Sequence, residues 1–238
     1  FFIREYTNRW FLNEFYLNAM TFLNYDALLV SSQELAFGDE FLRKTKIPFV
    51  SSNTEGLGLP YIIKEMAGLK IGILGVTDSL VESRAGLAWR LPGEAISRLA
   101  ADLRSQGVSY IIVLGAMTPQ ETRDFLGQVQ GVDLYVDGGI SFGTAMSRQE
   151  KGILVVSTWW QAKKIGVLTL ETAEGKLVAK DFSSVALAPT IADHAQVKAL
   201  IPACFNDGDC QLAGGFFATC QNPGTKEARC TVPQKVPV

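Results

Sequence analysis

The chain has 238 residues and a net charge of −2, from 22 Lys and Arg against 24 Asp and Glu. Hydrophobic residues make up 47% and charged residues 19%, which is typical of a globular protein with a sizeable core and excludes a disordered chain. Because positive and negative residues are mixed along the sequence, the charge pattern excludes a dedicated nucleic-acid or anionic-membrane surface. The longest apolar runs have the length of strands, so no transmembrane segment is predicted.

The first third of the chain predicts one helix and several short strands. Apolar residues at helical spacing predict a helix over residues 8–24. The short apolar runs 25–30 and 47–50 are each followed by polar residues and predict strands that end in loops. Residues 61–66 and 69–76 flank a tight turn and predict a β-hairpin. The chain starts with Phe1, without Met and without a signal-peptide pattern, so we expect a processed or partial chain.

Helices and strands then alternate. Residues 93–106 carry an apolar helical face, residues 110–114 read as a buried strand, and Thr118 caps a predicted helix that runs to residue 130. Further strands are predicted without intervening helices over residues 133–136, 153–157, 165–172 and 176–185. A short helix is predicted after them, over residues 193–200. Alternating strands and helices followed by consecutive strands predict a layered α/β sandwich with mixed sheets.

All four cysteines lie at the end of the chain. An even number of cysteines in a tail rich in Gly, Asn and Asp predicts disulfides and therefore an extracytoplasmic, oxidising compartment. A zinc site is the alternative, disfavoured because no C-x-x-C pair is present. The pairing is left open among the disulfide candidates Cys204, Cys210, Cys220 and Cys230.

Five phrases carry a family resemblance. They are NAMTFLNYD at residues 18–26 with SSQE at 31–34, IPFVSSN at 47–53, GLKIGILGVT at 68–77, LRSQGVSYIIVLGA at 103–116 and GVDLYVDGGIS at 131–141. In this order they resemble the calcineurin-like metallophosphoesterases, in particular the secreted 5′-nucleotidase branch that includes the Sox-system thiosulfohydrolases.

The resemblance implies a fold and a domain division. It implies an α/β/β/α metallophosphoesterase-like sandwich with mixed sheets over residues 1–201, with the first strand missing. A short, disulfide-rich C-terminal tail over residues 202–238 would follow.

The chain departs from these enzymes where they hold two divalent metals. At the metal-site phrases of the family, where Asn and His stand, the resemblance places Ser32, Gln33, Ala116, Gly139 and Ser141. Ser, Gln, Ala and Gly cannot replace anionic or imidazole ligands. The resemblance therefore implies a pseudoenzyme that has lost its metal ligands and binds no cofactor. Acids near these positions, such as Glu34 and Asp78, are expected to be solvated loop residues.

Two other features bear on function. The single histidine, His194, follows the scaffold and is expected at the surface, which leaves no base for a Ser-His-Asp triad. Trp159 and Trp160 either fill the former metal pocket or contact a partner, and a small-ligand platform is the less favoured alternative. The aromatic start of the chain is expected to dock onto another subunit, so the candidate partner contacts are Trp10, Phe11, Trp159 and Trp160.

Two functional hypotheses follow. The first is a non-catalytic structural or interaction subunit of an extracytoplasmic assembly, with other protein subunits as partners and a secreted redox assembly as the setting. The alternative is a ligand-binding protein or a hydrolase that uses the degenerate cleft with different chemistry.

Overall fold

The computed structural model describes residues 17–35, 39–85, 87–139, 146–158, 164–173, 176–188, 190–198, 219–223 and 227–231. The chain forms two compact units. The larger contains residues 26–39 and 48–191, and the smaller contains residues 1–25, 40–47 and 192–238. The predicted boundary between a domain over residues 1–201 and a tail over residues 202–238 falls outside the described residues and stays a prediction.

A six-stranded mixed sheet is the centre of the larger unit, with the order β3-β4-β5-β6-β8-β7. The four inner strands run parallel, and the two edge strands, β3 and β7, run antiparallel to their neighbours. The strands are β3 (Ile62–Met66), β4 (Leu69–Thr77), β5 (Val108–Ala116), β6 (Leu134–Asp137), β7 (Met146–Glu150) and β8 (Ile153–Ser157).

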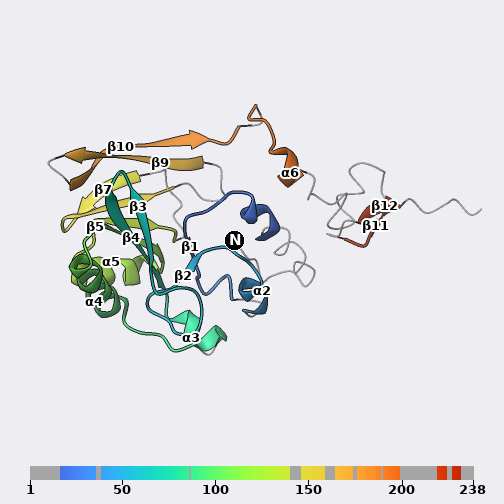
Figure 1. The fold of residues 1–238 in the computed structure, drawn as a ribbon. Helices are drawn as coiled ribbons and strands as arrows, with labels where there is room; N and C mark the ends of the chain where they lie inside the picture. The colour runs from blue at the N-terminus through green and yellow to red at the C-terminus, as the bar shows by residue number, and fades with distance from the viewer. Residues whose placement is uncertain are drawn as a thin grey trace, which may run out of the picture. The chain divides into compact units, whose positions relative to one another are not determined.

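Two helices connect parallel strands and cover one face of this sheet (Figure 1). They are α4 (Pro92–Ser105) and α5 (Pro119–Gln128), close to the predicted ranges. A capping box starts α5: the Glu121 amide donates to Thr118 Oγ1 at 3.2 Å, and the Thr118 amide donates to the Glu121 carboxylate at 3.0 Å. The core on this side includes Leu74, Val76, Ile96, Ile111, Val113, Phe125 and Tyr135.

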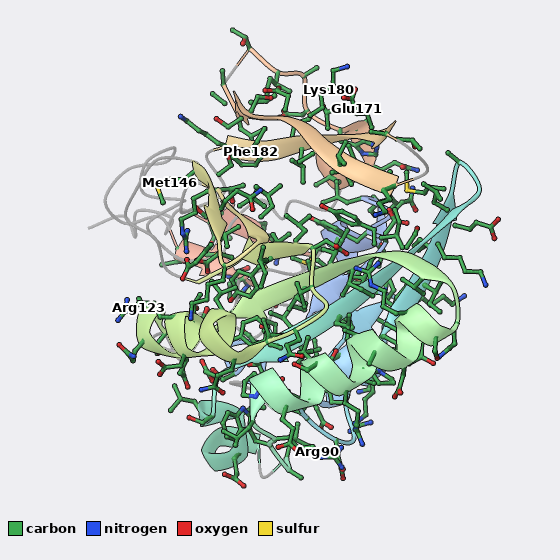
Figure 2. All side chains as sticks on the ribbon, turned by 90° about the vertical axis from the view of Figure 1, so that its left-hand side faces the viewer. Arg90, Arg123, Met146, Glu171, Lys180 and Phe182 are labelled. Carbon is green, nitrogen blue, oxygen red and sulfur yellow. The ribbon has the colours of Figure 1, made fainter. Side chains whose placement is uncertain are left out.

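A β-hairpin covers the opposite face of the sheet (Figure 1). Its strands are β9 (Lys164–Ala173) and β10 (Lys176–Ala186). Figure 2 shows Phe182 on β10, and its ring packs with Leu168, Leu170 and Leu177 against the second core cluster. That cluster consists of Ile71, Ile73, Tyr110, Leu134, Leu154 and Val156. The larger unit thus has a layer of helices, a mixed sheet and a hairpin, in that order. This arrangement confirms the predicted mixed α/β class.

The structure corrects two details of the prediction, and the fourth, helical layer of the α/β/β/α order stays a prediction. The sequence missed the polar edge strand β7 and the short helix α3 (Leu80–Ala85), since neither has a regular apolar pattern. The two early strands are shorter than predicted: β1 (Leu28–Leu29) pairs in parallel with β2 (Phe49–Val50).

The smaller unit contains short elements. Residues 17–21 are helical, within the predicted helix 8–24, and α2 (Glu40–Arg43) and α6 (Ala195–Lys198) are single turns. The ring centroids of Phe22 and His194 lie 6.4 Å apart. No described helix is both long and apolar enough to span a membrane.

Two of the four cysteines are described. They face each other in the register of β11 (Thr219–Gln221) and β12 (Arg229–Thr231), Cys220 opposite Cys230. Cys204 and Cys210 lie outside the described residues. The disulfide-rich character of the tail stays a prediction.

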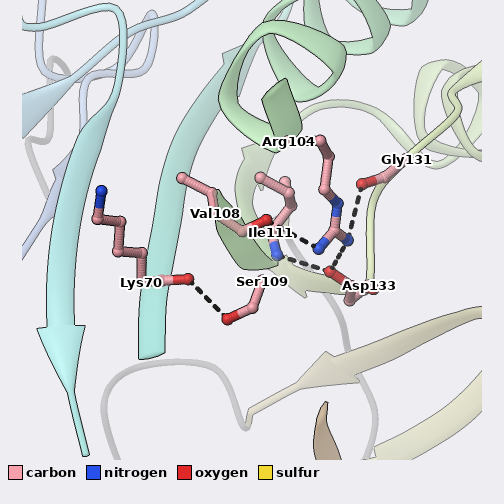
Figure 3. Close-up of polar contacts among 7 residues, drawn as sticks. All are labelled: Lys70, Arg104, Val108, Ser109, Ile111, Gly131 and Asp133. Atoms are coloured by element: carbon pink, nitrogen blue, oxygen red, sulfur yellow. Dashed lines mark hydrogen bonds and ion pairs between the residues drawn. The ribbon is translucent and has the colours of Figure 1, made fainter. Parts of the chain in front are cut away.

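A half-buried polar cluster at the amino ends of the parallel strands, here called the clamp, joins the end of α4 to β5 and to the residue before β6 (Figure 3). The Arg104 guanidinium contacts the Asp133 carboxylate and donates to the Val108 carbonyl at 3.3 Å. The same carboxylate accepts the Ile111 amide proton at 2.6 Å. Burial, with the Asp133 charge as a second cause, raises the pKa of neighbouring Tyr110 to about 12, so this phenol is neutral at physiological pH.

We expect Asp133→Ala to lower the free energy of unfolding by about 1–3 kcal/mol, because the Ile111 amide and Arg104 both lose their acceptor. Asp133→Asn retains an oxygen for the amide and should lose less. Urea denaturation followed by circular dichroism measures both. Equal stability of Asp133→Ala and the unsubstituted chain would contradict the clamp.

The β3–β4 turn offers a stabilising substitution. Ala67 has φ 50° and Gly68 has φ 76°, the pattern of a type I′ turn that prefers Asn-Gly. A left-handed conformation costs an L-residue such as Ala about 1–2 kcal/mol, and Asn tolerates it better. Ala67→Asn should therefore raise the denaturation midpoint, and the matched change Gly68→Ala should lower it. A lower midpoint for Ala67→Asn would count against this turn.

Candidate functional site

Polar side chains gather where the parallel strands of the larger unit end. The carboxyl ends of neighbouring parallel strands lie at one edge of a sheet, which is where α/β proteins place their sites. Nearly all buried polar residues of the described chain stand at such ends, and Thr122 on α5 is the exception. The set is Ser31, Ser32, Ser51, Asn53, Thr77, Thr122 and Ser157. This edge is the candidate site.

Asn53 joins the end of β2 to the end of β4. Its side chain is fully buried; Oδ1 accepts the Thr77 amide proton at 3.0 Å, and Nδ2 donates to the Thr77 carbonyl at 3.0 Å. Nδ2 also lies 3.3 Å from the Arg90 carbonyl. One side chain thus replaces a strand partner for Thr77. Because the side-chain amide of Asn53 bonds to backbone groups, its role is to stabilise the fold at this edge.

Two serine–carboxylate contacts follow the strand ends. The Ser32 hydroxyl, in a residue only 1% exposed, donates to Asp78 Oδ2 at 3.1 Å, and Asp78 Oδ1 accepts the Leu80 amide proton at 3.1 Å. The Ser31 amide donates to Glu34 Oε2 at 2.8 Å, and the Ser31 hydroxyl contacts the same oxygen. The prediction that Glu34 and Asp78 are simply solvated loop acids is therefore wrong, because both are positioned by hydrogen bonds.

A second group lies at the ends of β5, β6 and β8. The register pairs Asp137 with Gly115 on one side and with Ser157 on the other. The Gly139 amide donates to Asp137 Oδ1 at 3.0 Å, which turns the loop after β6 around this carboxylate. Gly115 must be glycine, since a Cβ atom there would overlap the phenol ring of Tyr135.

Two buried hydroxyl groups near this edge make no hydrogen bond in the described structure, namely Thr77 Oγ1 and Ser157 Oγ. Burial raises the pKa of the Tyr135 phenol, and a hydrogen bond with the Thr122 side chain opposes that rise in pKa. The phenol therefore keeps its proton at neutral pH. An unpaired buried hydroxyl costs about 1–3 kcal/mol, so such groups mark places where a polar ligand or water would be stabilised.

The predicted site positions separate into three groups. Ser32, Ala116 and Gly139 lie at this edge, with Ala116 in register with Thr77. Gln33 is exposed and its amide donates to Ser31 Oγ at 3.2 Å. The remaining predictions fall outside the described residues, namely Ser141, Trp10, Phe11, Trp159 and Trp160.

Sequence reasoning missed the polar residues that stand at this edge. The available signal was position, because each follows or ends an apolar strand. They are Asn53, Thr77, Asp137 and Ser157.

The described donors do not fit a dinuclear metal centre. Within the ranges that the structure describes, no group of three or more His, Cys, Asp or Glu side chains could hold a metal ion. The edge offers hydroxyls, single carboxylates on separate strands and an amide already used by the backbone. Two divalent ions need several anionic or imidazole ligands at one point. The complete loss of the metal ligands stays a prediction, since Ser141 is not described.

Sequence comparison finds similar proteins. No protein-family model matches the chain. It is 33% identical over 138 residues to a snake venom 5′-nucleotidase of Naja atra, covering 50% of this chain and 26% of that protein. It is 25% identical over 218 residues to the 5′-nucleotidase of Rattus norvegicus, covering 76% and 38%. The chain therefore spans well under half the length of these relatives.

Solved structures share the fold. The 5′-nucleotidase precursor of Thermus thermophilus superposes with a TM-score of 0.65 at 22% identity, covering 76% of this chain and 42% of that one. The sulfate thiohydrolase SoxB of the same genus gives a TM-score of 0.67 at 17% identity, covering 78% and 37%. These similarities confirm the resemblance to the 5′-nucleotidases and calcineurin-like phosphoesterases.

The first functional hypothesis needs correction. A non-catalytic structural or interaction subunit was predicted from the missing metal ligands, and the relatives overturn it because they are 5′-nucleotidases over the residues that they share with this chain. The alternative, a hydrolase or ligand-binding protein, fits better. The prediction failed because it treated the metal positions as the whole site.

We expect Gly115→Ala to destabilise the larger unit by about 1–3 kcal/mol through overpacking against Tyr135. The double change Gly115→Ala with Tyr135→Val removes the ring and should recover part of that loss. Thermal unfolding of the three variants gives the coupling. Strict additivity of the two changes would refute the contact between Gly115 and the phenol.

Proposed function

Because the chain is related in sequence and fold to the 5′-nucleotidases and calcineurin-like phosphoesterases, we propose that its larger unit is a hydrolase domain that acts on phosphate esters. The observation that carries the proposal is the polar edge itself: positioned hydroxyls and carboxylates follow the strand ends, in a chain that is 33% identical over 138 residues to a 5′-nucleotidase. The substrate class comes from the names of these relatives.

Asp78 is the proposed proton acceptor. Its carboxylate stands directly after β4 and is held by the Leu80 amide and the Ser32 hydroxyl, at 3.1 Å each. A carboxylate fixed by two donors can take a proton from a water molecule that attacks phosphorus. The carboxylic acid formed in this way can return the proton to the ester oxygen as its bond to phosphorus breaks, so that an alcohol and inorganic phosphate are released. No step is assigned to a metal, since the described donors do not fit one.

A second candidate is binding of the same esters without turnover. The observation that favours it is the donor set, since hydroxyls supply less charge stabilisation to a phosphoryl group than divalent cations do. In this second candidate the protein is a pseudoenzyme, which binds phosphate esters and does not hydrolyse them.

We also propose that the protein acts outside the cytoplasm. A similar protein is a venom 5′-nucleotidase, and the register of Cys220 with Cys230 suits a disulfide across β11 and β12. The α/β/β/α arrangement with a stapled tail, and the predicted partner proteins, belong to the same proposal.

Release of inorganic phosphate from AMP and from p-nitrophenyl phosphate, with EDTA present, tests the function. We expect metal-independent release that falls by about 10²-fold or more in Asp78→Asn, because the proton acceptor is lost. The matched control is Asp102→Asn, on the exposed face of α4, which should leave the rate unchanged.

The outcomes separate the candidates. Equal rates for Asp78→Asn and the unsubstituted protein would refute the role of Asp78. AMP binding with no phosphate release above buffer would leave binding without turnover, and the absence of both would overturn the proposed function.

A further inference from the structure

The hydroxyls, the Asn53 amide and the carboxylates that gather at the carboxyl edge carry no positive charge. The carboxylates are those of Glu34, Asp78 and Asp137. A phosphate ester brings negative charge to the same place, and like charges repel each other unless a cation lies close by. Hydrolysis or binding of such an ester beside Asp78 therefore calls for a cationic side chain at this edge.

A short antiparallel ladder leads to one cation, Arg90. Thr54 and Trp89 form an antiparallel bridge, and the Arg90 amide donates to the Asn53 carbonyl at 2.8 Å. The ladder thus fixes the backbone of Arg90 beside that of Asn53.

Two side chains tie this ladder to Thr77, the residue directly before Asp78. Asn53 Nδ2 lies 3.0 Å from the Thr77 carbonyl oxygen and 3.3 Å from the Arg90 carbonyl oxygen. Trp89 Nε1 donates to the same Thr77 carbonyl at 3.2 Å. Because one amide nitrogen holds both carbonyls, Arg90 stands at the strand end that Asp78 follows.

The Arg90 guanidinium is paired with a carboxylate that a ligand can replace. It contacts Glu55, and the two side chains are 51% and 57% exposed. Figure 2 shows Arg90 at the surface of the larger unit. An exposed ion pair contributes little to stability, because water solvates both partners well. The planar guanidinium binds two oxygens of a phosphoryl group in the same way as it binds a carboxylate.

We propose that Arg90 binds the phosphoryl group of the substrate, and that the Glu55 carboxylate occupies Arg90 until a phosphoryl group replaces it. The inference rests on the proposed function, because it names the residue that holds the phosphate beside Asp78. The guanidinium offsets the charge of the phosphoryl oxygens, which favours binding and also stabilises these oxygens while the ester bond breaks.

Calorimetric binding of inorganic phosphate at low ionic strength tests the proposal without turnover. We expect Arg90→Gln to lower the affinity for phosphate by about 10-fold or more, because a charge-assisted, two-pronged contact is lost. Arg90→Lys keeps the charge without the planar fork and should lose less. Glu55→Gln should raise the affinity by about 2–5-fold, because it removes the competing carboxylate of an exposed ion pair.

A second exposed ion pair supplies matched controls. Lys64 on β3 lies 2.9 Å from Asp26, measured from Nζ to Oδ1. Lys64→Gln and Asp26→Asn change the net charge as Arg90→Gln and Glu55→Gln do, and both should leave the affinity for phosphate unchanged. Thermal unfolding of all the variants checks that each remains folded.

The outcomes separate this inference from the proposed function. Undetectable phosphate binding by the unsubstituted protein, equal losses in Arg90→Gln and Lys64→Gln, or weaker binding in Glu55→Gln would overturn the proposal. Release of phosphate from AMP with an unchanged KM in Arg90→Gln would keep the hydrolase and remove the role of Arg90. The expected phosphate affinities without release from AMP would remove the hydrolase and keep the phosphoryl site.

Discussion

The parallel pairing of β4, β5, β6 and β8 is the constraint on which the rest of this unit depends. Parallel sheets are stable when both faces are covered. Here α4 and α5 cover one face and the β9–β10 hairpin covers the other, so the inner strands are apolar on both sides. Polar residues are then admitted only where a strand stops. Because both faces of the sheet are covered, the core is apolar and the polar residues of the candidate site lie at the carboxyl edge.

The amino and carboxyl ends of the parallel strands differ in how their polar groups are hydrogen-bonded. At the amino edge, the paired side chains of Arg104 and Asp133 satisfy the Val108 carbonyl and the Ile111 amide of β5. At the carboxyl edge, Asn53 performs the same task for Thr77, yet hydroxyls nearby remain without hydrogen bonds. A purely structural edge would fill these places with apolar groups. The contrast supports placing the candidate site at the carboxyl edge.

Sequence patterns predicted the regular part of this fold well. The hairpin of β3 and β4, the helices α4 and α5 and the strands β5 to β10, except β7, follow from apolar periodicity and from caps such as Thr118. The site was harder to predict, because its members are short polar residues that resemble ordinary loop residues. The roles of Asn53 and Ser157 follow only from contacts between separate strands: Asn53 hydrogen-bonds to the backbone of Thr77, and Ser157 is in register with Asp137.

The failed hypothesis has the same origin. Reading function from the metal positions alone treats the edge as empty once Ser32, Ala116 and Gly139 replace ligands. The structure shows that small residues there make room for other groups: Gly115 admits the Tyr135 phenol, and Ser32 orients Asp78. A hydroxyl-rich edge binds by matching donors and acceptors, whereas a metal pair binds by charge.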